Sequence, residues 1–295
     1  MTHDLRGVLT ALATPFDADQ AIDEPVLRRV IDRSLDAGVD GVVAAGSTGE
    51  VGALSHDERL RLVDLVVEHT AGRVPVVAQT GATTIREAIT LSKAAERAGA
   101  DVLMLVTPYY EPLSLEETVA YIKDVAGSVD LPVMLYNIPA VTGVNLDAAT
   151  ARSLAEDVPT IRYIKDSSAN WEQALQLIHH HSDVLGTFIG WDVYLYGALV
   201  EGAAGVMAGA ANVVPAEIVE VTRLIAEGDL TGALERWKRL YPAIEAMFSV
   251  PFLPAVKAGL ELTGLPIGPP RKPTAPLGDA ERETLAAALS ALQGR

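Results

Sequence analysis

Short apolar runs recur along this chain at about the spacing of one strand plus one helix, and this repetition constrains the fold more than any other feature. The starts of the runs lie roughly 20 to 35 residues apart. The eight runs cover residues 7–13, 41–45, 74–78, 102–106, 133–136, 161–164, 184–189 and 205–208. Apolar residues in the runs are mostly consecutive rather than at alternate positions, which is typical of parallel strands buried on both faces.

The segments between the runs carry signals for helices. Three segments contain a serine or threonine followed three residues later by a glutamate, a pattern that can satisfy the free N–H groups at a helix start. These pairs are Ser55 and Glu58, Thr84 and Glu87, and Ser114 and Glu117. Strands alternating with helices, without a dinucleotide-binding glycine pattern after the first run, predict an α/β fold in the form of a closed (β/α)8 TIM barrel.

The pattern changes beyond residue 227, where only helices are expected. Apolar side chains there follow steps of three and four residues, which predicts one apolar stripe that packs on the barrel or on another chain. The stripe consists of Leu234, Trp237, Tyr241, Ile244 and Phe248. We therefore expect a barrel over residues 1–227 and a C-terminal helical subdomain over residues 228–295 that packs on the barrel.

Composition excludes several classes of protein. The net charge is −16, and such an acidic surface repels phosphate backbones and anionic lipids, so we expect no nucleic-acid and no membrane partner. The absence of cysteine from the sequence excludes disulfides, thiolate metal sites and cysteine nucleophiles. The first residues do not resemble a leader, and no apolar stretch is long enough for a bilayer. These features predict a cytoplasmic protein.

Lys165 directly follows the apolar run 161–164, where a hydrated charge is unexpected. An apolar pocket lowers the pKa of a lysine, and the neutral amine can attack a ketone. The alternative is an ordinary lysine at a strand end with its ammonium group in water. Tyr136 ends the run 133–136 and offers a phenol that can relay protons for such an amine, although a tyrosine at this place is also typical of a structural role.

In a barrel of this kind, the residues that follow the strands meet at one mouth. Ser47 and Thr48 lie between two glycines after the second run. Hydroxyls and backbone N–H groups in such a segment can hold an anion, and a small carboxylate would fit. The joint occurrence of this segment with Lys165 and Tyr136 favours the reactive interpretation of the lysine.

Four segments, in chain order, carry a resemblance to a known family. They are Gly-Ser-Thr-Gly-Glu at 46–50, Thr-Pro-Tyr-Tyr at 107–110, Tyr-Asn-Ile-Pro at 136–139 with Thr-Gly at 142–143, and Ile-Lys-Asp at 164–166. With these segments the chain resembles the dihydrodipicolinate synthase / N-acetylneuraminate lyase family over nearly its whole length. The resemblance implies a lyase of the class I aldolase type that needs neither a metal nor a cofactor.

By the same resemblance, Lys165 would form a Schiff base with the keto carbon of pyruvate or a longer 2-oxo acid, and Tyr136 would act as general acid and base. Ser47 and Thr48 would hold the carboxylate of this substrate. Tyr110 would reach into the site of a neighbouring subunit and complete a proton relay with Thr48 and Tyr136, in a homotetramer built from two tight dimers. Gly190 and Val206 match wall positions of the family's pocket.

Two departures from the family bear on the second substrate. Synthases of the family carry an arginine for a substrate carboxylate where this chain has Val141, which argues against aspartate semialdehyde. Sialic acid lyases carry an acidic residue where this chain has Val193. The segment 165–168 is more similar to members that cleave or dehydrate 2-keto-3-deoxy sugar acids or 4-hydroxy-2-oxoglutarate. We therefore predict such a lyase, with pyruvate and an aldehyde as partners, and the candidate contacts to the aldehyde are Ser167, Asp192 and Asn212.

Several alternatives remain open. Within the family these are 4-hydroxy-tetrahydrodipicolinate synthase, which joins pyruvate to aspartate semialdehyde, and N-acetylneuraminate lyase. The glycine-containing segment 205–215 would suit a phosphate in a phosphosugar aldolase or isomerase, although no basic residue lies nearby. A non-enzymatic sensor that binds a 2-oxo acid is the last alternative, but a sensor needs neither Lys165 nor Tyr136.

Three further features are assigned structural roles. Residues 179–181 are consecutive histidines, which point in different directions on a helix and cannot share one metal ion, so we expect a solvated helix end. Glu50 is expected to bond to the turn that follows it. Lys257 is expected to cover apolar surface with its stem while its ammonium group points outward.

Overall fold

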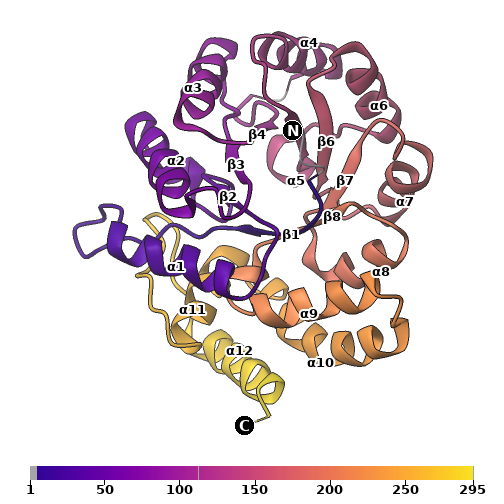
Figure 1. Ribbon diagram of the computed structural model, residues 1–295. Helices are drawn as coiled ribbons and strands as arrows, with labels where there is room; N and C mark the ends of the chain where they lie inside the picture. Colours follow the sequence, from indigo (N-terminus) through magenta and orange to yellow (C-terminus); the bar gives the residue numbers. More distant parts are fainter. Residues whose placement is uncertain (1–4, 112, 295) are drawn as a thin grey trace. The chain divides into compact units, whose positions relative to one another are not determined.

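The computed structural model of the chain describes residues 5–111 and 113–294 (Figure 1). In these residues eight strands form one closed barrel in chain order, which confirms the predicted (β/α)8 fold. The strands are β1 (Gly7–Ala11), β2 (Gly41–Ala44), β3 (Val76–Gln79), β4 (Val102–Val106), β5 (Val133–Asn137), β6 (Ile161–Asp166), β7 (Gly186–Ile189) and β8 (Gly205–Ala208). Every residue of β4 and β5 is buried, as the continuous apolar runs require.

Helices follow the strands in the expected alternation. They are α1 (Glu24–Asp36), α2 (His56–Thr70), α3 (Ile85–Ala98), α4 (Leu115–Ala126), the short α5 (Pro139–Thr142), α6 (Ala148–Asp157), α7 (Trp171–His180), α8 (Leu195–Val200), α9 (Pro215–Ala226), α10 (Leu230–Phe248), α11 (Phe252–Leu262) and α12 (Asp279–Leu292). Ser55 and Ser114 cap α2 and α4 in the reciprocal arrangement with the glutamate three residues on. The Thr84 side chain accepts a hydrogen bond from Glu87 N at the start of α3.

Two strands are longer than their apolar runs. β5 extends to Asn137 and β6 to Asp166, so Lys165 lies inside a barrel strand rather than after it, and Tyr136 is followed by one further strand residue. In the parallel register of β5 and β6, Tyr136 is the partner of Lys165 and Asn137 is the partner of Asp166. The pairing of β5 with β6 therefore brings the two predicted catalytic side chains next to each other.

The chain forms two compact units, and residues 5–7 with Pro75–Met207 make up the first. It contains β3 to β7 and most of β8. Glycine allows close approach at one place in it, because a Cβ atom at Gly186 would lie 2.8 Å from the ring of Tyr163. That ring packs edge-on against Phe188 with 6.1 Å between the centroids. The Tyr163 hydroxyl accepts a hydrogen bond from Leu5 N, at 3.2 Å.

The second unit consists of Val8–Val74 together with the C-terminal residues from Ala208 onward. In it α10 packs against α9, α11 and α12 (Figure 1). The buried face of α10 consists of Ala233, Leu240, Ala243, Ile244 and Met247. Of the predicted stripe only Ile244 belongs to this face, whereas Leu234 is exposed and Trp237 stacks edge-on against Tyr241.

The predicted stripe is therefore not the face that α10 buries within its own unit, and its packing on another chain stays a prediction. The small side chains of Ala233 and Ala243 let neighbouring helices come close, and a pattern of large apolar residues does not reveal such a face. The predicted division into residues 1–227 and 228–295 stays a prediction. Among the described residues, no helix combines the length and apolarity needed to cross a membrane, and the cytoplasmic location likewise stays a prediction.

Candidate active site

Lys165 and Tyr136 form the centre of the candidate site in the first unit. Lys165 is 5% exposed and Tyr136 is 2% exposed. The Nζ atom of Lys165 lies 4.1 Å from the centre of the Tyr136 ring. A cationic amine at this distance is attracted by the face of the ring. The structure thus places a primary amine and a phenol together in a buried part of the barrel.

A second polar pair lies one residue further along the same two strands. Asn137 Nδ2 donates to Asp166 Oδ1 and to Asn145 Oδ1, each at 2.9 Å, and Asn137 Oδ1 accepts from Leu146 N at 3.0 Å. Successive side chains of a strand point to opposite faces, so this pair lies on the face away from Tyr136 and Lys165. The hydrogen bond between Asn137 and Asp166 connects the two strands at the register that pairs the amine with the phenol.

The Asp166 carboxyl has three side-chain donors around it. Besides Asn137 they are Gln173 Nε2 at 3.2 Å and Ser168 Oγ at 2.9 Å. Burial raises the pKa of Asp166, and these hydrogen bonds oppose the rise. Asp166 and Asn137 had no predicted role of their own. The available signal was the occurrence of polar residues at the end of strands that are otherwise apolar.

Ser167 and Gly190 shape the surroundings of Lys165. Ser167 N donates to Asn137 O at 2.8 Å, and Ser167 Oγ donates to Gly190 O at 3.1 Å. A Cβ atom at Gly190 would overlap Ser167 Oγ and would lie 2.5 Å from Cε of Lys165. Gly190 therefore leaves the space that the lysine side chain occupies. Val206 is buried in β8, where it pairs with Ile189.

Three other predicted site residues of the first unit differ in their exposure. Asp192 is 3% exposed in the short 3-10 helix η2 (Asp192–Tyr194). Val141 is 57% exposed on α5, and Tyr110 is 82% exposed in the segment between β4 and α4. Both exposed side chains are available to other molecules.

Ser47 and Thr48 belong to the second unit and lie in the segment between β2 and the 3-10 helix η1 (Val51–Ala53). Ser47 is exposed and Thr48 is 9% exposed. Hydrogen bonds hold this segment in a tight turn, with Glu50 N donating to Ser47 O at 3.1 Å and Thr14 Oγ1 donating to Gly49 O at 2.7 Å.

Asn212 lies in the 3-10 helix η3 (Ala210–Asn212) and is 1% exposed. Its amide nitrogen donates to Ala11 O at 2.7 Å and to Gly209 O at 2.8 Å. Its amide oxygen accepts from Ala13 N at 2.9 Å. Both amide hydrogens are thus engaged with the backbone, and the side chain connects η3 to the end of β1.

The expectations for Glu50 and Lys257 were wrong. Lys257 does not point outward, because its side chain is 3% exposed and its Nζ atom lies 2.6 Å from Oε1 of Glu50, whose side chain is 2% exposed. Glu50 therefore pairs with α11 rather than with the turn that follows it. Burial lowers the pKa of Lys257, and the neighbouring Glu50 carboxylate opposes this effect. The partners lie far apart in the sequence, so a local pattern did not reveal them.

The histidine run ends α7, and His179 Nε2 lies 2.9 Å from Glu201 Oε2 at the surface. Within residues 5–111 and 113–294, no group of three or more His, Cys, Asp or Glu side chains is arranged to hold a metal ion. The candidate site offers an amine, a phenol and hydroxyl groups.

The sequence profile of the Dihydrodipicolinate synthetase family matches residues 4–292. The chain belongs to this family. It is 38% identical over 284 residues to the 4-hydroxy-tetrahydrodipicolinate synthase of Pelobacter propionicus, covering 96% of this chain and 97% of the relative. It is 38% identical over 293 residues to the synthase of the same name from Desulforudis audaxviator, covering 99% of each chain.

Solved structures of the family are similar to the chain in fold. The 4-hydroxy-tetrahydrodipicolinate synthase of Methylacidiphilum fumariolicum superposes with a TM-score of 0.94 at 33% identity, covering 98% of this chain and 96% of that one. A prophage protein of the family from E. coli, solved in complex with pyruvate, has a TM-score of 0.93 at 32% identity and covers 98% of each chain. As a member of this family the protein is a pyruvate-dependent lyase of the class I aldolase type.

Proposed function

We propose that Lys165 forms a Schiff base with the keto carbon of pyruvate. The observation that carries this proposal is the buried amine 4.1 Å from the centre of the Tyr136 ring. The nitrogen adds to C2, the carbonyl oxygen takes a proton to give a carbinolamine, and loss of water leaves the imine. The protonated imine withdraws electrons, so C3 can release a proton to give an enamine that attacks an aldehyde, or the reverse steps can cleave that bond.

Tyr136 is proposed to move the protons of these steps. Its phenol would protonate the carbinolamine oxygen as water leaves and would take a proton back afterwards. Thr48 and Tyr110 are proposed to extend this relay, with Tyr110 supplied by a neighbouring subunit of a homotetramer. The 82% exposure of Tyr110 supports a role outside its own subunit.

Ser47 and Thr48 are proposed to bind the pyruvate carboxylate. Their hydroxyls and the N–H groups of the turn offer neutral donors, and such donors suit an anion without adding a cation beside the reacting lysine. Gly190 and Val206 are proposed to form the walls around the methyl and keto groups. The close approach of Gly190 to the Lys165 side chain supports this assignment.

Two candidates remain for the second substrate. The names of the relatives favour aspartate semialdehyde over the keto-deoxy acid that the sequence predicts, since the synthases from Pelobacter propionicus and Desulforudis audaxviator match nearly the full length of the chain. Val141 favours the keto-deoxy acid, because an exposed valine cannot bind a carboxylate through two hydrogen bonds as an arginine guanidinium group does. In either case Ser167, Asp192 and Asn212 are the proposed contacts, and Asn212 would contact the substrate through its amide oxygen because both of its amide hydrogens bond to backbone oxygens.

The shared first step is tested by trapping. The protein is incubated with pyruvate and borohydride, and peptides are mapped by mass spectrometry. We expect a carboxyethyl group on Lys165 of the wild type, no such group in Lys165→Ala, and no turnover in that variant. Lys257, the other buried lysine described above, is an internal control that should remain unmodified. Binding of pyruvate without trapping would instead support a sensor.

The second substrate is tested with two assays on the same preparation. One supplies pyruvate with aspartate semialdehyde and measures their consumption, and the other measures pyruvate release from a panel of 2-keto-3-deoxy acids and 4-hydroxy-2-oxo acids. If Val141 determines which second substrate is used, Val141→Arg should gain turnover of aspartate semialdehyde while Val141→Leu should not. Equal turnover of aspartate semialdehyde in the wild type and Val141→Arg would show that residue 141 does not determine the second substrate.

A further inference from the structure

The turn that carries Ser47 and Thr48 ends at Glu50, whose backbone is in an unusual conformation. Glu50 has φ 60° and ψ 37°, in the left-handed region that glycine adopts more easily than any other residue. The surrounding structure must offset the cost of this conformation. The side chain turns inward rather than into solvent and is 2% exposed.

Each carboxylate oxygen of Glu50 has a partner from the C-terminal part of the chain. Oε1 lies 2.6 Å from Nζ of Lys257 on α11, and Oε2 accepts a hydrogen bond from Arg271 N at 2.9 Å. Lys257 also donates to Pro269 O at 3.1 Å. The carboxylate thus connects the turn to α11 and to the segment that follows it.

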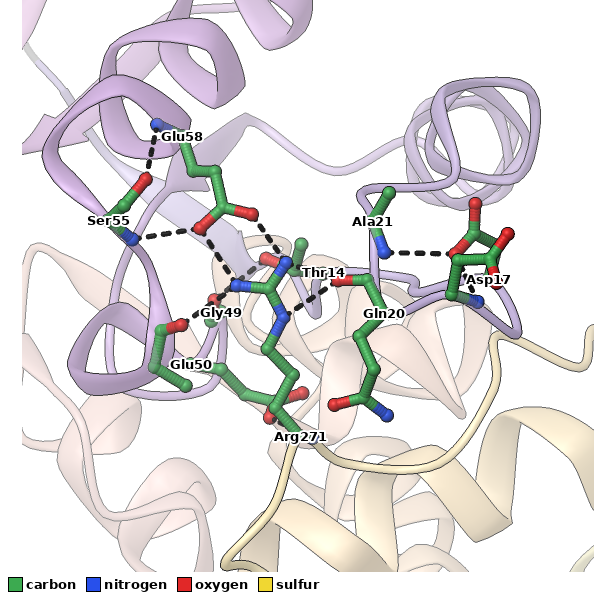
Figure 2. A network of polar contacts seen from close by, with 11 residues as sticks. Thr14, Asp17, Gln20, Ala21, Gly49, Glu50, Ser55, Glu58 and Arg271 are labelled. Carbon is green, nitrogen blue, oxygen red and sulfur yellow. Dashed lines mark hydrogen bonds and ion pairs between the residues drawn. The ribbon is translucent and has the colours of Figure 1, made fainter.

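Arg271 is itself fixed on several sides. Figure 2 shows its guanidinium group between the carboxylate of Glu58 and the backbone oxygen of Gln20. It also donates to Ala53 O at 2.8 Å. The ring of Phe16 lies under both cations, with its centre 4.1 Å from Cζ of Arg271 and 4.5 Å from Nζ of Lys257. Because these partners surround the two cations, Glu50 is held by groups that cannot easily follow a movement of the turn.

Gly209 lies close both to the start of α11 and to Thr48. A Cβ atom at Gly209 would lie 2.5 Å from the ring of Phe252, at the start of α11, and 3.1 Å from Oγ1 of Thr48. The space between Phe252 and the Thr48 hydroxyl is therefore only as wide as a glycine. The start of α11 lies beside one end of the turn, and Lys257 holds the other end.

We propose that Glu50 is a positioning residue, whose buried pairing with Lys257 sets the Ser47–Thr48 turn to receive the carboxylate of the 2-oxo acid. This inference rests on the proposed function, in which that turn binds the carboxylate. Glu50 does not touch the substrate. It determines how well the chain distinguishes a ketone with a carboxylate from a ketone without one, and α11 thereby contributes to substrate selection.

The test compares two ketones on the same protein. Pyruvate and acetone both offer a methyl ketone to Lys165, but only pyruvate has the carboxylate. The wild type and Glu50→Gln are trapped with borohydride over a range of each ketone, and labelling of Lys165 is measured by mass spectrometry. We expect Glu50→Gln to need at least about tenfold more pyruvate for half-maximal labelling, while its labelling by acetone stays within about twofold of the wild type.

Glu50→Gln leaves the Lys257 cation without its partner, so a second variant is needed. The double variant Glu50→Gln/Lys257→Met removes both charges, keeps an acceptor for Arg271 N and fills the space of the lysine stem. It should show the same loss of preference for pyruvate. Thr84→Ala removes the cap of α3 and serves as a destabilised control that should keep the wild-type preference.

The outcomes separate the two proposals. If acetone and pyruvate labelling decline together in both Glu50 variants, or if both variants keep the wild-type preference, Glu50 does not position the turn and the inference is overturned. If the wild type shows no labelling of Lys165 with either ketone, the proposed function itself fails. A loss of preference for pyruvate in the variants, with labelling by acetone retained, supports both.

Discussion

Substituting Lys257 should show how much its ion pair with Glu50 contributes to the free energy of unfolding. The attraction between unit charges 2.6 Å apart is about 6 kcal/mol at an effective dielectric constant of about 20. Burial of both ions cancels most of this gain, so the intact pair contributes little net stability. Lys257→Met keeps the apolar stem but leaves the Glu50 carboxylate buried without its partner. We expect a loss of about 3 to 5 kcal/mol in the free energy of unfolding.

The nearby Arg271 favours the lower end of that range, since its backbone N–H group still bonds to Glu50. Urea unfolding followed by circular dichroism would measure the loss. Glu50→Gln should cost a similar amount. The double variant Glu50→Gln/Lys257→Met leaves no buried charge unpaired and should cost at least about 2 kcal/mol less than the sum of the two single variants. Additive losses, or single losses below about 1 kcal/mol, would refute a buried and mutually dependent pair.

Three further predictions concern single side chains. Tyr136→Phe should lower kcat by about 10² to 10⁴ in steady-state assays, as expected when general acid and base help is lost, and a kcat near that of the wild type would exclude this role. Asp166→Ala leaves one of the two amide hydrogens of the buried Asn137 without an acceptor. It should lower the free energy of unfolding by about 1 to 3 kcal/mol and slow the labelling of Lys165, and an unchanged melting temperature would contradict this. A hydrogen bond from Arg271 is the largest cause that lowers the pKa of Glu58, to about 2 from 4.5. Because the pKa is lower in the folded state, the pairing stabilises the protein above about pH 4.5, and this contribution disappears as the pH falls to about 2. The free energies of unfolding of the wild type and Glu58→Gln should therefore differ by about 1 kcal/mol at pH 7, a value reduced for the exposure of the pair, and should become equal near pH 2.

The barrel could be predicted from the sequence because its signals are local. Continuous apolar runs and serine or threonine caps act within one strand or one helix, and the capping arrangements of Ser55 and Ser114 occur as the sequence predicts. The closeness of Lys165 to Tyr136 follows from the pairing of neighbouring strands, which the alternation of strands and helices implies. Their catalytic roles came from the family resemblance and remain to be measured.

The features that escaped prediction depend on partners distant in the sequence. A lysine in an apolar helix can direct its ammonium group to water or bury it beside a carboxylate, and only the position of Glu50 decides for Lys257. For α10, large apolar side chains suggested one face, but the close approach of neighbouring helices selected the face with Ala233 and Ala243. A local sequence pattern shows neither the distant partner of a buried charge nor how closely neighbouring helices pack.

A crystal structure of the wild type soaked with pyruvate tests the central claim most directly. The account predicts continuous electron density from Nζ of Lys165 to C2 of the substrate, with the Tyr136 hydroxyl within hydrogen-bonding distance of the adduct. Pyruvate bound with a separate Lys165 amine, or joined to another lysine, would contradict the account.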